Sequence, residues 1–205
     1  MKIKNRILWI TQTALFLGLT VATQYYLTTL LGGPGNPVSQ LAVGSLVNMF
    51  LILATVMCGF FSGLSLAVIT PFISFAIGKM PHVWIIPFVA LGNTVIVFIF
   101  WLVCGKKIFG QNFSLNWAVA AISGAIFKFG VLWLGVTQIF VKFILPNDAA
   151  LKAPQIAKMT SVISFNYSFP QLATALTGSI LVYVIYPVLE KAVTGKKADI
   201  NNLKN

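Results

Sequence analysis

Residues 83–103 read VWIIPFVALGNTVIVFIFWLV, a predominantly apolar run without a single charged side chain. An α-helix rises about 1.5 Å per residue, so a helix of this length crosses the roughly 30 Å hydrocarbon core of a bilayer. The run therefore predicts a membrane-spanning helix. Five other apolar stretches predict further spans, and the full set covers about 7–31, 41–57, 60–77, 83–103, 116–145 and 165–189.

The composition of the whole chain indicates a lipid environment. Hydrophobic residues make up 58% of the 205 residues and charged residues only 8%, whereas soluble domains carry about 25% charged residues. The first stretch is too long for a cleaved signal peptide, so we expect it to remain as a helix. The sequence thus predicts an all-α integral membrane protein, a single transmembrane domain over residues 1–205 that forms a bundle of six transmembrane helices.

The distribution of charge predicts how this bundle faces. Lys and Arg number 14 against three acidic residues, for a formal net charge of +11. The basic residues form no face on which a phosphate backbone could lie, so nucleic acid is not expected as a partner. Cytoplasmic loops are enriched in Lys and Arg, and we therefore expect a multi-pass protein of the cell membrane with both termini in the cytoplasm. The nine basic residues that favour this orientation are Lys2, Lys4, Arg6, Lys106, Lys107, Lys191, Lys196, Lys197 and Lys204.

Residues suited to catalysis are scarce. No Asp or Glu falls within a predicted span, and the single histidine, His82, lies in a predicted loop. The sequence contains no paired carboxylates and no zinc, nucleophile or phosphate-binding motif. Cys58 and Cys104 have no metal-ligand spacing and are expected to stay free thiols on the reducing side of the membrane. We therefore expect a non-catalytic chain with no cofactor, no metal site and no ATP hydrolysis of its own.

One cation lies inside a predicted span. Lys128 is about halfway along residues 116–145, where a charge is costly and usually faces a partner, a cavity or water. No acidic residue within the spans is available to pair with it. Lys128 either reaches an interface or backbone carbonyls, or it has an anionic ligand, such as a carboxylate, as its partner.

Three amides also lie inside predicted spans: Asn48, Asn93 and Gln171. Buried amides often bond only to neighbouring helices. The alternative is that these amides line one cavity with Lys128, open toward the outside. Four residues could supply its aromatic or polar walls, namely Trp84, Trp133, Asn166 and Tyr167.

The first span carries a stripe of small side chains. Ala14, Gly18 and Ala22 recur every four residues and therefore share one face of a helix. Small residues let a second helix approach closely. The stripe serves either packing inside this chain or contact with a partner protein.

Four short motifs resemble one family of transport proteins. They are GSLVN at 44–48, TPF at 70–72, PFVALGN at 87–93 and SFPQL at 168–172. With the small size, the six spans and the small-residue stripe, they resemble the substrate-binding S components of energy-coupling-factor (ECF) vitamin transporters, in the broad group with pantothenate, folate and pyridoxine-type members.

The resemblance implies a vitamin-binding subunit without an energy source of its own. Such a subunit binds to a transmembrane coupling subunit, which links it to two cytoplasmic ATPases. In the family the small-residue stripe faces the coupling subunit, although Gly18 replaces the alanine that the family usually has. The vitamin lies toward the outer side, partly covered by extracellular loops, and transport is described as toppling of the loaded S component.

The residues rank the candidate vitamins. The spans hold no anionic group for cationic thiamine, and no His or acidic cluster for a metal ion. Lys128 with nearby amides favours a small carboxylate that carries hydroxyl and amide groups, and pantothenate fits best. Folate, pyridoxine-type ligands and cobalamin remain open. Two other classes also remain, a stand-alone secondary transporter or channel and a membrane scaffold that binds no small molecule.

Overall fold

The computed structural model describes residues 3–34 and 36–194. Of the described residues, 86% are helical and none forms a strand, which confirms the predicted all-α class. The helices follow in this order: α1 (Ile3–Ala22), a π-helical turn (Thr23–Leu27), α2 (Thr28–Leu30), α3 (Pro37–Cys58), α4 (Phe60–Ala76), a 3₁₀ turn (Val83–Ile85), α5 (Ile86–Phe100), a π-helical end (Trp101–Gly105), α6 (Phe113–Leu132), a π-helical extension (Trp133–Ile144), a 3₁₀ turn (Leu145–Asn147), α7 (Ala153–Asn166) and α8 (Phe169–Thr194).

Several of these segments run on from one another, and five of the resulting helices are long and apolar enough to cross a membrane. α4 is an apolar helix in addition to these five and is shorter than they are. Its 17 residues extend about 25 Å at the usual rise per residue. Pro71 lies inside α4. The five long helices cover Arg6–Leu30, Pro37–Cys58, Val83–Gly105, Phe113–Asn147 and Ala153–Ala192.

Local signals in the sequence explain where α3 begins and ends. The side chain of Asn36 accepts a hydrogen bond from the backbone N–H of Val38 at 2.9 Å, and Pro37 occupies the first turn. This combination is favoured at helix N-termini. Gly59 ends the helix with φ +96°, a conformation that glycine adopts without steric cost. The chain therefore reverses at once into α4.

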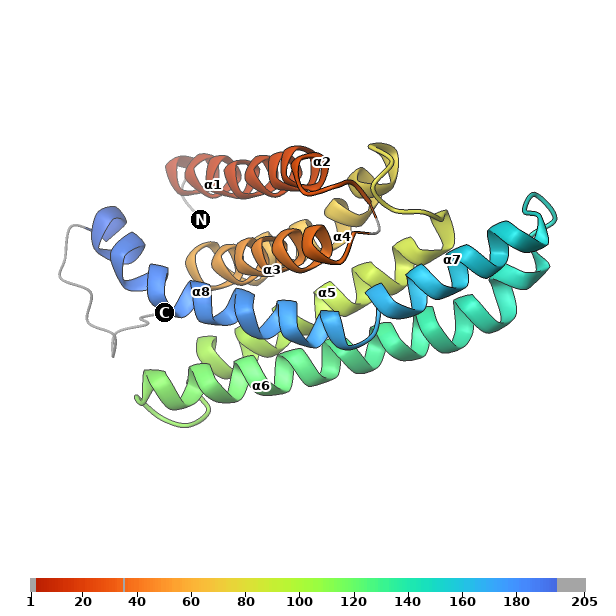
Figure 1. Ribbon diagram of the computed structural model, residues 1–205. Coiled ribbons are helices and arrows are strands. Elements are labelled where there is room, and N and C mark those ends of the chain that lie inside the picture. Colours follow the sequence, from red (N-terminus) through yellow and green to blue (C-terminus); the bar gives the residue numbers. More distant parts are fainter. Residues whose placement is uncertain (1–2, 35, 195–205) are drawn as a thin grey trace.

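Residues 146–164, between the predicted spans 116–145 and 165–189, include Asp148, Lys152 and Lys158 and predict a polar connection from the sequence. In the structure this segment is largely helical instead. Its helix α7 begins after Lys152, whose backbone N–H donates to the side chain of Gln155 at 2.9 Å. Ile156, Met159 and Ile163 follow at helical spacing and pack into one hydrophobic cluster with the π-helical extension of α6. Figure 1 shows α7 running beside the end of the α6 helix, and the two form a hairpin that projects past the other helices.

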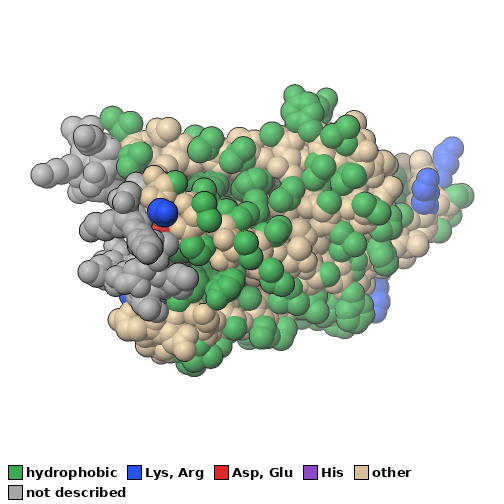
Figure 2. All heavy atoms as spheres, turned by 60° about the vertical axis from the view of Figure 1, so that its left-hand side comes forward, with side chains coloured by type: hydrophobic (Ala, Val, Ile, Leu, Met, Phe, Trp, Pro, Cys, Tyr) green, Lys and Arg blue, Asp and Glu red, His purple; other side chains and the backbone are tan. Residues whose placement is uncertain are grey.

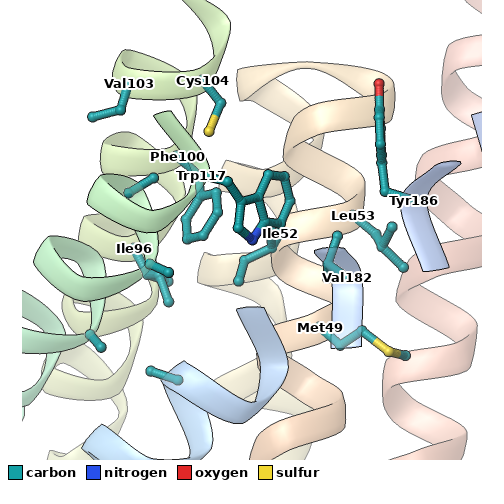
Figure 3. Close-up of a cluster of buried hydrophobic side chains, with 14 of the residues drawn as sticks. Met49, Ile52, Leu53, Ile96, Phe100, Val103, Cys104, Trp117, Val182 and Tyr186 are labelled. Carbon is teal, nitrogen blue, oxygen red and sulfur yellow. The ribbon is translucent and has the colours of Figure 1, made fainter. Parts of the chain in front are cut away.

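The hydrophobic core fills the half of the bundle that is nearer the start of α1 and the end of α8. Trp117 lies between Phe100 and Ile52 in this cluster (Figure 3) and is 4% exposed. Its indole N–H donates to the backbone oxygen of Ser179 at 3.1 Å, so the polar atom of this large side chain is satisfied. The opposite half holds a second hydrophobic cluster, around Phe140 and Ile163, and several buried polar side chains such as Asn93 and Lys128.

Three connections place basic residues at the same end of the molecule. The start of α1, the turn between α5 and α6, and the end of α8 lie together in Figure 1. The turn carries Lys106, whose ammonium lies 4.9 Å from the centre of the Trp101 ring. Figure 2 shows hydrophobic side chains spread over the middle of the surface and basic side chains toward its ends. Of the nine basic residues that predicted the orientation, Lys2, Lys196, Lys197 and Lys204 lie outside the described residues, as does the side chain of Lys4.

Candidate ligand-binding cavity

A cavity of about 330 Å³ occupies the half of the bundle opposite the hydrophobic core. Its walls come from the first helix and from α3, α4, α5, α6, α7 and α8, and loop residues Pro34 and 78–81 lie at its mouth. Ligand sites in proteins are concave, lined mainly by apolar groups with a few converging polar ones, and typically measure about 300–1,000 Å³. The size of this cavity suits a small ligand.

Lys128 supplies a buried cation to this cavity, whereas Lys79 lines it from the loop. It lies on α6, is 3% exposed, and donates to Asn48 Oδ1 at 2.5 Å and to Asn93 Oδ1 at 2.7 Å. The structure thus brings together the lysine and two of the amides expected from the sequence, from α6, α3 and α5. An ammonium carries three N–H donors, and these two bonds use two of them. One donor remains for another partner.

The positive charge of Lys128 has no acidic counterpart in the cavity. Of the acidic residues whose side chains are described, Asp148 lies in the loop before α7 and Glu190 near the end of α8, and neither lines the cavity. An isolated charge in a low-dielectric region is costly unless a group of opposite charge or a set of oriented dipoles compensates it. Amide oxygens supply dipoles only, so no carboxylate in the cavity wall neutralises Lys128.

A residue that the sequence reasoning missed fixes the orientation of Asn48. The hydroxyl of Thr174 accepts a hydrogen bond from Asn48 Nδ2 at 3.3 Å and donates to the backbone oxygen of Gln171 at 3.1 Å. Because the amide nitrogen of Asn48 faces Thr174, its oxygen faces Lys128. Thr174 lies three residues after Gln171, on the same face of a helix, and this spacing was the available signal.

Two glycines allow α3 and α8 to approach closely enough for this contact. A Cβ atom at Gly178 would lie 2.7 Å from Asn48 Cβ, and one at Gly44 would lie 2.9 Å from Thr174 Cγ2. Both distances are too short for a real side chain. The absence of these side chains therefore sets the helix spacing at which Asn48 and Thr174 meet.

The junction of α7 and α8 forms a further wall. Asn166, Tyr167 and Gln171 line the cavity there, as their positions in the sequence suggested. Gln171 Nε2 donates to the backbone oxygen of Asn166 at 2.9 Å, which secures the chain where the two helices meet. The Oδ1 atom of Asn166 is buried without a partner.

The two tryptophans expected as walls lie elsewhere. Trp84 is 57% exposed and borders a separate shallow surface pocket with Asp148. Trp133 is 39% exposed. Leu132 is fully buried and packs against Gly92. Successive residues of a helix point about 100° apart, so the next side chain, Trp133, turns outward.

The first helix contributes residues that the sequence reasoning did not select. Gln24 lies in the π-helical turn, is 9% exposed and lines the cavity with Thr28. Their spacing of four residues within an apolar span places both on one helical face. Polar residues at this spacing were the signal that could have identified them.

The loop at the mouth of the cavity is attached on both sides. Lys79 Nζ donates to Thr29 Oγ1 at 3.0 Å and lies 5.4 Å from the centre of the Tyr25 ring. Three residues later, His82 Nε2 lies 2.8 Å from Asp148 Oδ2. The hydrogen bond with His82, followed by one from the backbone N–H of Ala150, holds the pKa of Asp148 below its usual range. These contacts hold the loop against the first helix on one side and the α7 hairpin on the other.

The small-residue stripe of the first helix faces away from the bundle. Ala14, Gly18 and Ala22 are exposed, and a Cβ atom at Gly18 would meet nothing within 4 Å. The opposite face packs inward, where Thr20 is fully buried. The stripe is therefore available to a partner rather than used in packing within this chain.

Comparison with known proteins gives one match. A family model described as "ECF transporter, substrate-specific component" matches residues 9–190, a range that takes in the whole cavity, its loop and the small-residue stripe. No curated protein and no solved structure matches the chain. Among the described residues, no group of three or more His, Cys, Asp or Glu side chains could hold a metal ion.

Proposed function

The chain belongs to the family of ECF transporter substrate-specific components, and from this premise we propose that it captures a small anionic vitamin, pantothenate first among the candidates. Membership implies a substrate-binding, non-catalytic subunit that works with an energising module. The identity of the vitamin and the roles of individual residues are our proposal. The cavity is the site where the vitamin would bind.

The uncompensated charge of Lys128 is the observation that carries this proposal. Its ammonium is buried, held by Asn48 and Asn93, and retains one N–H donor toward the cavity. A ligand carboxylate would accept this hydrogen bond and supply the missing negative charge. Hydrogen bonds between ionised groups are roughly twice as strong as neutral ones. Ligand binding would thus offset the cost of burying the lysine.

The rest of the cavity favours pantothenate over the other candidate vitamins. Pantothenate joins a carboxylate to an amide and two hydroxyl groups, and the walls carry amides and hydroxyls that can pair with such groups. The volume of about 330 Å³ lies at the lower end of the usual range of about 300–1,000 Å³, which argues against cobalamin and disfavours folate. Thiamine would bring a second positive charge next to Lys128.

Under this proposal, the chain needs partner subunits to transport the vitamin. We place the cavity toward the outside, and the start of α1 and the end of α8 in the cytoplasm, because the turn with Lys106 and Lys107 lies beside these two termini. A transmembrane coupling subunit would contact the exposed small-residue stripe of the first helix and link it to two cytoplasmic ATPases. Binding would then belong to this chain, and ATP hydrolysis to its partners.

Calorimetric titration of the detergent-purified chain against a vitamin panel tests the proposal. We expect tight binding of pantothenate, and a loss of about 100-fold or more in affinity for Lys128→Met, since a charged hydrogen bond and the buried cation that faces the ligand are removed. Lys142→Met, in the projecting hairpin, is the matched control and should bind as the wild type does.

Two results would contradict the proposal. One is unchanged affinity in Lys128→Met, which would remove the argument for an anionic vitamin. The other is vitamin uptake into liposomes that contain this chain alone, which would indicate a self-sufficient transporter. Uptake only with the partner subunits and ATP is the expected outcome.

A further inference from the structure

Two buried oxygen atoms in the cavity wall have no hydrogen-bond partner. They are Gln24 Oε1 and Asn166 Oδ1, on side chains that are 9% and 7% exposed. Both side chains line the cavity. A third such atom, Thr137 Oγ1, belongs to a residue that does not line it. Most buried polar side-chain atoms in proteins have a partner, so two exceptions in one cavity wall require an explanation.

The two oxygens lie on walls other than those that hold the Lys128 ammonium. Gln24 comes from the π-helical turn of the first helix, and Asn166 is the last residue of α7. Lys128 is held between α3, α5 and α6 by Asn48 and Asn93. A ligand in this cavity would therefore meet a donor with a positive charge on one side and two acceptors elsewhere.

A neighbouring polar residue on the same face of the first helix, unlike Gln24, has a hydrogen-bond partner. Thr20, one turn earlier on the same helix, donates its hydroxyl to the backbone oxygen of Phe16 at 2.7 Å. This local bond satisfies a hydroxyl within its own helix. The longer side chain of Gln24 leaves its Oε1 atom without such a bond, and the residue forms part of the cavity wall.

An unpaired buried acceptor lowers stability until a donor reaches it. A carboxylate cannot be that donor, because an ionised carboxylate only accepts hydrogen bonds. A hydroxyl or an amide N–H can. A ligand that pairs with Gln24 and Asn166 would therefore do so through parts other than its anionic end.

We infer that Gln24 and Asn166 form a subsite that accepts hydrogen bonds from hydroxyl groups of a ligand whose anionic group lies at Lys128. This inference rests on the proposed function and narrows its substrate class to carboxylates that carry such donors. A carboxylate of the same shape without the donors leaves both oxygens unpaired. A site built to pair with a substrate hydroxyl discriminates strongly against an analogue that lacks it.

A pair of ligands tests the inference by calorimetric titration. Pantothenate carries two hydroxyl groups, and N-(3,3-dimethylbutanoyl)-β-alanine keeps its carboxylate, amide and branched carbon skeleton without them. The wild type should bind pantothenate about tenfold or more tightly than the analogue. Gln24→Met, which keeps the length of the side chain, should lose about tenfold in affinity for pantothenate and keep its affinity for the analogue.

Thr137→Val is the matched control. It removes a buried unpaired oxygen that lies outside the cavity, so it should leave both affinities unchanged. Asn166→Leu provides a second test in another wall, with the same selective loss for pantothenate expected. The thermal unfolding temperature of ligand-free Gln24→Met should equal or exceed that of the wild type, because an unpaired buried acceptor is removed.

The results separate this inference from the proposed function. Equal affinity of the wild type for the two ligands, with both dependent on Lys128, would overturn the subsite and leave the anion-binding site intact. Equal losses for both ligands in Gln24→Met, or a clear fall in its unfolding temperature, would assign Gln24 a purely structural part and overturn the subsite too. Binding of neither ligand by the folded wild type would overturn the proposed function and the subsite with it.

Discussion

At the scale of single residues, Lys128 shows how a charge is accommodated inside a membrane bundle. Two amide oxygens, at 2.5 and 2.7 Å, replace part of the hydration shell that the ammonium would have in water. Thr174 orients one of these amides through its own hydrogen bond. The lysine therefore does not need to reach the membrane interface, which was one of its two interpretations from the sequence.

Asp148 gives a prediction about pH at the same scale. Its hydrogen bond with His82, and then that from Ala150, lower its pKa in the folded protein. A lowered pKa means that the charged form contributes stability above the unfolded pKa of about 3.9, and that this contribution is lost as the pH falls through the folded value. We expect the difference in unfolding temperature between the wild type and Asp148→Asn to shrink as the pH drops below about 4.

Thermal unfolding in detergent between about pH 6 and pH 3 measures this difference. Ser123→Ala, which removes an uncharged hydrogen bond on α6, should differ from the wild type by the same amount at every pH. A difference for Asp148→Asn that does not change across this range would show that the pair with His82 adds no stability.

At the scale of helices, the contact between α3 and α8 is tightly constrained at Gly178. A Cβ atom there would lie 2.7 Å from the backbone oxygen of Ser45, and the α3 backbone cannot move aside without shifting Asn48. We expect Gly178→Ala to destabilise the protein by about 1–3 kcal/mol and to weaken vitamin binding. Gly130→Ala, on α6 with nothing within 4 Å of the new atom, should be neutral or slightly stabilising.

Unfolding temperature and vitamin affinity, measured on both variants, check this expectation. If Gly178→Ala bound and unfolded like Gly130→Ala, the close approach of the two helices would not set the position of Asn48.

The helices also show where sequence patterns were sufficient and where they were not. Long uncharged runs such as 83–103 predicted spanning helices because hydrophobic length alone decides insertion in a bilayer. α7 was missed because Lys152, Lys158 and the polar residues around them suggested a loop. The helix is stabilised instead by Ile156, Met159 and Ile163, which recur at helical spacing and pack against the α6 extension. Few and widely spaced apolar residues are enough when a neighbouring helix is long enough to receive them.

At the scale of the whole molecule, the proposed orientation leads to a labelling experiment. With Cys58 and Cys104 replaced by alanine, Ala149→Cys lies in the exposed loop before α7 and Gln111→Cys in the exposed turn before α6. A membrane-impermeant maleimide added to intact cells should label Ala149→Cys, and Gln111→Cys only after permeabilisation. The reverse result would place the cavity on the cytoplasmic side and contradict capture from outside.

The cavity as a whole was only partly predictable. Lys128, Asn48 and Asn93 stood out because polar side chains are rare and costly inside spans, and the structure brings them together. Trp84 and Trp133 were selected by residue type alone, without knowledge of the direction in which each faces. Gln24 and Thr28 share one helical face of an apolar span, which the sequence shows, but that this face borders the cavity depends on how the first helix packs against α3 and α4, which a single sequence does not reveal.

The hydrophobic cluster around Trp117 closes the bundle at the end away from the cavity. Phe100, Ile52 and the indole ring pack in the half of the bundle that lies beyond the floor of the cavity, and interiors packed at protein density exclude water. A small molecule in the cavity therefore has no continuous path through the bundle to the other side. We therefore expect this chain by itself to conduct neither protons nor sodium across a bilayer. Release of a ligand on the other side of the membrane would then require the whole helix bundle to change its orientation in the bilayer.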